Sequence, residues 1–239
     1  MSSLISLSPT AGRPPTSLGA SRCVVWLSGD SLAGNANNTA LTLWPDSSGN
    51  GRDFTLAGAT KPTWKTGIQN GRGAVYFDGA SSTGLRAGIA LTAFHTVLAV
   101  VLGNAANTNS VLGEHSADAN SNDGHYIYTT GLVNRRTALT SANIAANQNP
   151  LIEPVAKVMS FQFNCRNVGY RVNGQPLIAT TTVGATGGTT ATTQYNLCSR
   201  NQASLFFVGH VAEYVIMDGP VSDQELANLE YYFHRKYAI

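Results

Sequence analysis

Short runs of apolar and β-branched residues, each ended by Gly, Asn, Asp or Pro, are the feature that most limits what this chain can fold into. They predict eight strands, over residues 24–27, 74–77, 96–102, 126–128, 158–163, 169–172, 205–208 and 211–217. In one of them Met159, Phe161 and Phe163 alternate with polar residues. This alternation is typical of an antiparallel strand with one face in a core and the other in water. The chain is therefore expected to be mostly β.

Two further patterns refine this expectation. Residues 97–102 are apolar at every position, which predicts a central strand covered on both faces. Asn173 and Gly174 follow an apolar run, and this pair readily adopts positive φ at both centres of a type I′ turn. We expect a tight hairpin there.

One helix is predicted, at the end of the chain. Ser222 can cap the backbone N–H of Glu225 while Glu225 reaches back to Ser222. Apolar residues then recur at three- and four-residue spacing, which predicts a helix over residues 223–236. We expect it to pack on the edge of the β domain.

The composition of the chain excludes two classes of partner, nucleic acid and the membrane interior. The 239 residues carry 15 Lys and Arg against 13 Asp and Glu, a formal charge of +2, and only 12% of the residues are charged. Such a chain has no basic surface for nucleic acid. No apolar run approaches the roughly 20 residues that cross a bilayer, so membrane insertion is not expected. The length suits one sizeable β domain.

The first 22 residues are rich in Ser, Pro and Gly, which predicts an extended N-terminal arm ahead of a domain at 23–239. Leu4, Ile5 and Leu7 are too few to fold alone, so we expect the arm to become ordered by binding another chain. No basic start or long apolar stretch of a signal peptide is present. Synthesis in the cytoplasm, without export, is the expectation.

Three sequence blocks resemble bacterial and phage-encoded concanavalin A-like, laminin-G-like jelly-roll domains over residues 22–239. They read VWLSGD with LWPDSSGNG, KPTW with NGRGAVYFDG, and GHVAEYVIM with VSDQE and YYFHRKY. The resemblance implies a two-sheet antiparallel jelly-roll sandwich with a C-terminal α-helix. This fold carries lectins, glucanases, adhesion modules and virion proteins, so it does not define a function.

Hydrolase chemistry has little support. A retaining glycosidase needs two carboxylates about 5 Å apart, and Glu213 has no acidic neighbour until Asp218. We therefore expect no catalytic residue and a structural Glu213 whose charge is met by a nearby Arg, Lys or backbone donor. The three tryptophans are expected in the core rather than on a sugar-stacking platform: Trp26, Trp44 and Trp64.

Cofactors are not expected, although calcium deserves a test. Oxygen-bearing side chains alternate at Asp118, Asn120, Asn122 and Asp123, but the turn glycine comes late and no bidentate Glu follows. A solvated loop is favoured. Residues 46–51 also match part of a calcium-binding loop. They are interpreted as a turn held by side-chain to backbone hydrogen bonds. The three cysteines are expected to be buried reduced thiols: Cys23, Cys165 and Cys198.

The leading hypothesis is a non-enzymatic virion structural protein of a tailed phage, on the capsid surface or tail. Its partners would be other virion proteins or copies of itself, with a cell-surface glycan as a further partner. The alternative is a carbohydrate-binding, lectin-like module. A glycan-cleaving enzyme ranks third.

Overall fold

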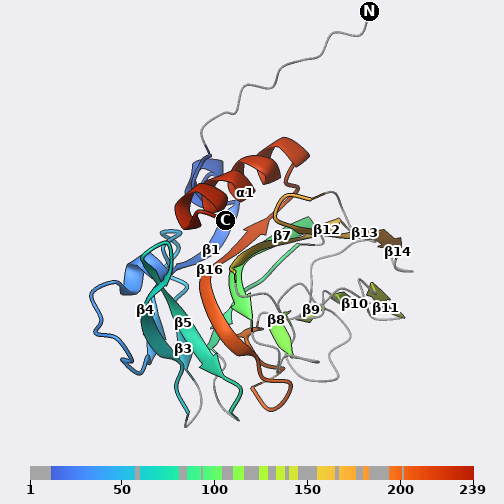
Figure 1. The fold of residues 1–239 in the computed structure, drawn as a ribbon. Coiled ribbons are helices and arrows are strands. Elements are labelled where there is room, and N and C mark those ends of the chain that lie inside the picture. Colours follow the sequence, from blue (N-terminus) through green and yellow to red (C-terminus); the bar gives the residue numbers. More distant parts are fainter. Residues whose placement is uncertain are drawn as a thin grey trace, which may run out of the picture.

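The protein is described by a computed structural model in which two antiparallel β-sheets pack face to face and one helix covers the outer side of the first sheet (Figure 1). The structure describes residues 12–56, 60–80, 85–92, 94–103, 110–115, 124–128, 133–137, 140–144, 155–164, 167–175, 180–182, 194–200 and 202–239. The prediction of an all-β jelly-roll sandwich with a C-terminal helix is confirmed.

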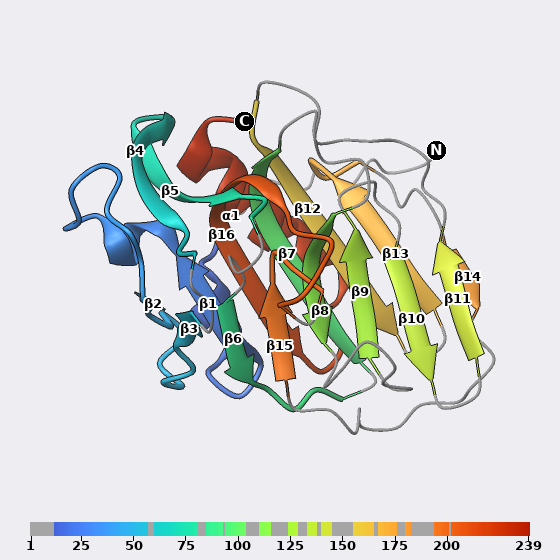
Figure 2. The same cartoon turned by 90° about the horizontal axis from the view of Figure 1, so that it is seen from below.

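Each sheet contains eight strands (Figure 2). The first runs in the order β14 (Thr180–Thr182), β13 (Asn167–Val172), β12 (Lys157–Asn164), β7 (Phe94–Gly103), β16 (Val208–Asp218), β5 (Arg72–Asp78) and β4 (Thr63–Gln69), and β1 (Cys23–Ser28) also pairs with β16. The second runs β11 (Thr140–Ile144), β10 (Val133–Thr137), β9 (Gly124–Tyr128), β8 (Val111–His115), β15 (Gln194–Leu197), β6 (Leu85–Gly88), β3 (Phe54–Leu56) and β2 (Leu43–Trp44). The helix is α1 (Asp223–Tyr237), and two 3₁₀ turns are η1 (Pro15–Leu18) and η2 (Gly29–Leu32).

The alternation of side chains along β7 produces two apolar layers. Val97, Ala99 and Val101 point into the core between the sheets. Leu98 and Val100 point the other way, into a second layer beneath α1. Residues 97–102 are thus covered on both faces by the sandwich and the helix, which confirms the predicted central strand.

The helix begins at the predicted residue but does not pack at the predicted place on the β domain. The Ser222 side chain accepts from the Glu225 N–H, and the Glu225 carboxylate accepts from the Ser222 N–H, forming a capping box. The helix ends at Tyr237, within one residue of the prediction. It packs on the outer face of the first sheet, not on the sandwich edge, because its apolar stripe needs an apolar partner.

This position of α1 corrects a second expectation. The polar face of β12 was predicted to lie in water, yet Ser160 is buried and donates to Glu230 of the helix at 2.5 Å. The predicted core face of the same strand is confirmed, since Met159 and Phe161 lie between the sheets.

Strand β16 organises the first sheet. β7 pairs along one side of it, while β5 pairs with residues 208–211 and β1 with residues 213–217 on the other side. The register shifts between Val211 and Glu213, at a β-bulge. Val211 and Tyr214 face the inner core, so the bulge leaves the two residues between them, Ala212 and Glu213, to the outer face.

The turn at residues 46–51 has the structure predicted from its sequence. The Asp46 carboxylate accepts from the N–H groups of Trp26, Ser48 and Arg52 at 2.9 to 3.0 Å. The Asn50 amide donates to backbone oxygens of β1, the shortest bond being 2.7 Å to Cys23. The turn fastens β1 to the edge of the second sheet, and both Asp46 carboxylate oxygens accept from protein donors.

Other local predictions have mixed outcomes. Asn173 and Gly174 both have positive φ, and the Gln175 N–H bonds to the Val172 carbonyl, which confirms the turn. The predicted strand at residues 205–208 is wrong: Leu205 has φ of +51°, and of these four residues only the last lies in β16. Strands that the sequence patterns did not predict are β2, β3, β4, β6, β8, β10, β11, β14 and β15.

The N-terminal segment packs on its own domain as far as it is described. Pro15 is buried, Leu18 contacts the layer beneath α1, and Arg22 forms an ion pair with Glu225 at 2.7 Å. The prediction that the arm becomes ordered only by binding another chain is therefore wrong for residues 12–22. Leu4, Ile5 and Leu7 lie outside the described residues, and their role in assembly stays a prediction.

Two of the three cysteines, Cys23 and Cys198, are buried free thiols, and burial raises the pKa of Cys23 to about 12. Cys165 lies outside the described residues. No helix in the described part of the chain is long and apolar enough to cross a membrane.

The capping box predicts a pH dependence of stability. The Arg22 hydrogen bond, followed by the Ser222 N–H, lowers the pKa of Glu225 from 4.5 to about 2. A group with a depressed folded-state pKa stabilises the fold above its unfolded pKa and loses that contribution as the pH falls towards the folded value. Glu225→Gln should therefore lower the free energy of unfolding at pH 6, by no more than about 1 kcal/mol for so exposed a pair. Urea unfolding should show the difference fading between pH 4.5 and pH 2, and a constant difference would contradict the assignment.

Candidate functional site

Lys236, in the last turn of α1, is the centre of a cluster of charged side chains. Its ammonium lies 2.6 Å from the Glu213 carboxylate and 2.8 Å from that of Asp30. Only 6% of its side chain is exposed. A cation so deeply buried is stable only when it is paired and hydrogen-bonded, and this cluster supplies both.

Glu213 is fully buried at the bulge of β16 and accepts hydrogen bonds from several elements. Besides Lys236, its donors are Trp26 Nε1 at 2.7 Å, Tyr237 Oη at 2.6 Å and Ser28 Oγ at 3.1 Å. The carboxylate thus joins β1, β16 and α1. This is the structural role predicted for Glu213, with a Lys as its counter-ion.

Asp30 forms the outer half of the cluster. It lies in η2, whose first turn is capped by Ser28 Oγ, and it accepts two hydrogen bonds from Arg72 Nη1 at 2.8 and 2.9 Å. Arg72 Nε also donates to the Lys236 carbonyl at 3.0 Å. Arg72 therefore links β5 to the carboxyl end of the helix.

Opposite charges counteract the effect of burial on the pKa values of this cluster. Burial tends to raise the pKa of Asp30, but Lys236 and Arg72 outweigh burial and lower it. Burial tends to lower the pKa of Lys236, but Glu213 and Asp30 outweigh burial and raise it. Burial raises the pKa of Glu213, and Lys236 is the strongest of the groups that oppose the rise.

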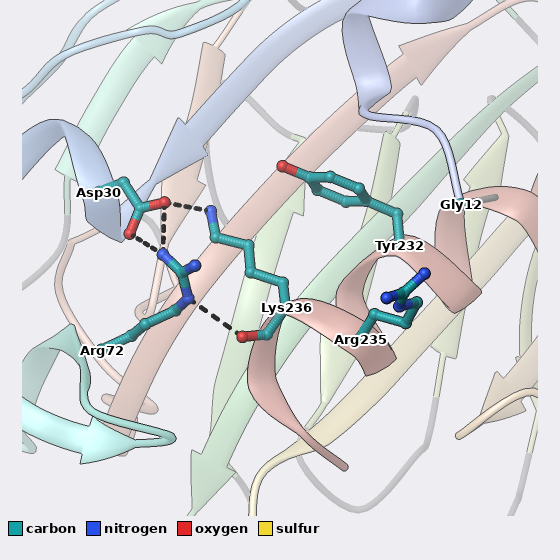
Figure 3. A pocket seen from close by; sticks show the side chains of 6 residues that line it. All are labelled: Gly12, Asp30, Arg72, Tyr232, Arg235 and Lys236. Atoms are coloured by element: carbon teal, nitrogen blue, oxygen red, sulfur yellow. Dashed lines mark hydrogen bonds and ion pairs between the residues drawn. The ribbon is translucent and has the colours of Figure 1, made fainter.

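A pocket of about 350 Å³ opens above this cluster (Figure 3). It is lined by Gly12, Asp30, Arg72, Tyr232, Arg235 and Lys236. Tyr232 is half-buried, and its ring meets Trp26 edge to face at 6.4 Å. The pocket thus combines an aromatic side chain, fixed from behind by a tryptophan, with a carboxylate and three cationic groups.

The wall formed by the N-terminal segment depends on Gly12. A Cβ atom at this position would lie 2.5 Å from the Tyr232 nitrogen and 2.6 Å from its Cα. Only glycine lets the segment approach the helix backbone so closely. Gly12 therefore places the chain beside Tyr232 and closes one side of the pocket.

Two cationic groups of the pocket keep free donors. Within the part of the chain that the structure describes, Arg235 is exposed and has no ion-pair or hydrogen-bond partner. Arg72 uses Nε and Nη1, while its Nη2 has no partner among the same residues.

None of the described residues that line this pocket was predicted from sequence as a site. The calcium candidates lie outside the described residues: Asp118, Asn120, Asn122 and Asp123. Among the residues that are described, no group of three His, Cys, Asp or Glu could hold a metal ion. Trp44 and Trp64 are buried as predicted, whereas Trp26 is only partly buried and supports Tyr232.

The pocket residues were not predicted as a site because they are far apart in the sequence. Asp30 and Arg235 both lie within the blocks that carry the family resemblance. Their spacing gives no sign of a common site, since β1, β5 and α1 meet only in the folded sandwich.

Comparison with known proteins identifies a fold but no family. No family model and no curated protein matches the chain. Among solved structures, domain 4 of the extracellular arabinanase AbnA from Geobacillus stearothermophilus, in complex with arabinotriose, has a TM-score of 0.64 at 15% identity, covering 87% of this chain and 98% of that domain. The binding domain of botulinum neurotoxin serotype D has a TM-score of 0.63 at 9% identity, covering 92% of this chain and 53% of that one.

A GH54 α-L-arabinofuranosidase is similar to the chain as well, with a TM-score of 0.60 at 14% identity over 83% of this chain. The chain spans about half of this enzyme's and of the toxin domain's length. The TM-scores establish the β-sandwich fold. At identities this low they do not establish the function, which must be argued from the site.

The ion cluster makes a prediction about stability. Lys236→Met should lower the free energy of unfolding by about 3 kcal/mol or more, because the Glu213 carboxyl group is left buried without its cation. Adding Glu213→Gln removes that carboxyl group and leaves a neutral amide whose oxygen can accept from Trp26 Nε1 while its N–H group donates to the Tyr237 hydroxyl. The double variant should therefore be more stable than the sum of the single losses implies. Chemical denaturation of the three variants tests this, and losses that add within about 0.5 kcal/mol would contradict it.

The close contact of Gly12 makes a second prediction. Gly12→Ala should lift the N-terminal segment from α1 and speed hydrogen exchange of the Ser17 and Gly19 amides, whose bonds close η1. Gly34→Ala is the matched control, since a Cβ there meets nothing within 4 Å. Unchanged exchange in Gly12→Ala would mean that the segment is held in another way.

Proposed function

We propose that this protein is a non-enzymatic carbohydrate-binding module whose ligand occupies the pocket beside Tyr232. The observation that carries the proposal is the composition of that pocket: an aromatic side chain held by Trp26 and surrounded by charged hydrogen-bonding groups. Sugars present apolar C–H faces and a rim of hydroxyl groups. A ring beside fixed polar groups matches both properties.

The size of the pocket agrees with this ligand class. Small-molecule pockets commonly start at about 300 Å³. At about 350 Å³, this one accommodates one sugar residue, with the rest of a glycan chain extending into solvent.

The structural neighbours support the same ligand class. The arabinanase domain is described in complex with arabinotriose, and the ligand-binding domain of botulinum neurotoxin serotype D in complex with N-acetylneuraminic acid. The second structure has a TM-score of 0.62 at 10% identity. These sugars belong to those proteins, and they favour the carbohydrate-binding alternative over a virion role.

The carboxylates of the pocket support a binding role. Asp30 is held by Arg72 and Lys236, which lower its pKa and leave no proton to donate near neutral pH. Glu213 is fully buried beneath the cluster. Neither group is free to act as an acid or a nucleophile on a glycosidic bond.

The test is glycan binding by paired tyrosine variants. Tyr232→Leu keeps apolar bulk against Trp26 but removes the ring and hydroxyl, and should weaken glycan affinity at least about tenfold. Tyr231→Leu is the control, because Tyr231 is adjacent in α1, 39% exposed and outside the pocket lining. A glycan array on the native protein selects the ligand, and calorimetry compares the variants.

Two results would contradict the proposal. One is the absence of saturable binding to any saccharide on the array. The other is glycan hydrolysis by the native protein that disappears in Glu213→Gln, which would make the protein an enzyme.

The bacterial and phage type of this fold, and a capsid or tail location, stay predictions from sequence. None of the neighbours named above is described as a virion protein.

A further inference from the structure

Charge is concentrated in the pocket far beyond the average of the chain. Only 12% of all residues are charged, yet four of the six lining residues are. Counting Glu213 beneath them, the cluster contains three cationic side chains and two carboxylates. One positive charge is therefore left uncompensated among the described residues.

The uncompensated charge belongs to Arg235. Lys236 is enclosed by Glu213 and Asp30, and Arg72 is paired with Asp30. Arg235 lies one residue before Lys236 in α1, borders the pocket and has no partner in the part of the chain that is described (Figure 3). Its whole guanidinium group remains available to a ligand.

Arg72 adds a second free donor. The ion pair with Asp30 occupies Nη1 and the Lys236 carbonyl occupies Nε, which fixes the guanidinium plane and leaves Nη2 at the pocket. An arginine held in place in this way loses little conformational entropy when it binds a ligand. Planar guanidinium groups match the two oxygens of a carboxylate.

Resting on the carbohydrate-binding function proposed above, we infer that the ligand is an acidic saccharide whose carboxylate is bound by Arg235, while Arg72, on the far side of Lys236, donates to a hydroxyl group of the same sugar (Figure 3). The sugar ring lies against Tyr232. Uronic acids and sialic acids are the classes with this chemistry. Asp30 would repel the same carboxylate if it were free, but its two cationic neighbours neutralise it.

The experiment compares matched acidic and neutral sugars on the native protein by calorimetry. The pairs are oligogalacturonate with its methyl ester, and N-acetylneuraminic acid with its methyl ester; a sulfated neutral oligosaccharide tests the other common anionic group. Each acidic sugar should bind about tenfold or more tightly than its ester, since a hydrogen bond to a charged group is lost with the charge. Raising the salt concentration should narrow that difference.

Arg235→Gln is the diagnostic variant, because an exposed side chain that contacts no partner among the described residues can be replaced without loss of fold. It should weaken binding of the acidic sugar about tenfold and change binding of the ester less than twofold. Arg235→Lys keeps the charge but not the planar group, and should fall between the two. Lys61→Gln removes an exposed cation outside the pocket lining and should change neither.

The outcomes separate this inference from the proposed function. Equal affinity for acid and ester, unaffected by Arg235→Gln, would overturn the acidic ligand while leaving carbohydrate binding in place. Binding of the sulfated sugar alone would overturn the carboxylate. If no saccharide binds, the proposed function itself fails, and this inference with it.

Discussion

The buried ion pair between Lys236 and Glu213 is the interaction on which the first sheet and its helix depend. Glu213 occupies the bulge of β16, at the point where β5 gives way to β1 as the neighbouring strand. Its carboxyl group is fully buried, and Lys236 reaches it as a counter-ion from the last turn of α1. The helix must therefore end over this bulge. Its apolar side chains then pack against the outer face of the first sheet.

The pocket is a consequence of that anchoring. Once Lys236 is held, the preceding turn of the helix presents Tyr232 and Arg235 at the surface, next to η2 and β5. Asp30 and Arg72 then complete the charge balance from those two elements. The same contacts that fasten the helix to the sheet thus hold Asp30, Arg72 and Lys236 in place beside an aromatic side chain. Binding sites are most selective when their polar groups are fixed in advance in this way.

Sequence patterns predicted the fold where local and tertiary preferences agree. The core face of β12, the two-sided cover of β7 and the capping box at Ser222 were all readable, because alternation and capping depend on near neighbours in the chain. The water-facing side of β12 was mispredicted for the opposite reason. Ser160 looks solvent-exposed by its polarity, but a helix from the far end of the chain covers it and supplies Glu230 as partner. Most short strands of the second sheet gave no pattern long enough to recognise.

The sequence by itself determined the class of fold, the buried fates of Trp44 and Trp64, the turn at residues 46–51 and the structural character of Glu213. Each of these follows from residue type, spacing and the cost of burying a charge. Only the tertiary structure decided which lysine neutralises Glu213, and that Asp30, Arg72, Tyr232 and Arg235 border one pocket. These residues come from η2, β5 and α1, up to 205 positions apart. Their approach depends on sheet register and on where the helix docks, which long-range packing sets and local sequence does not encode.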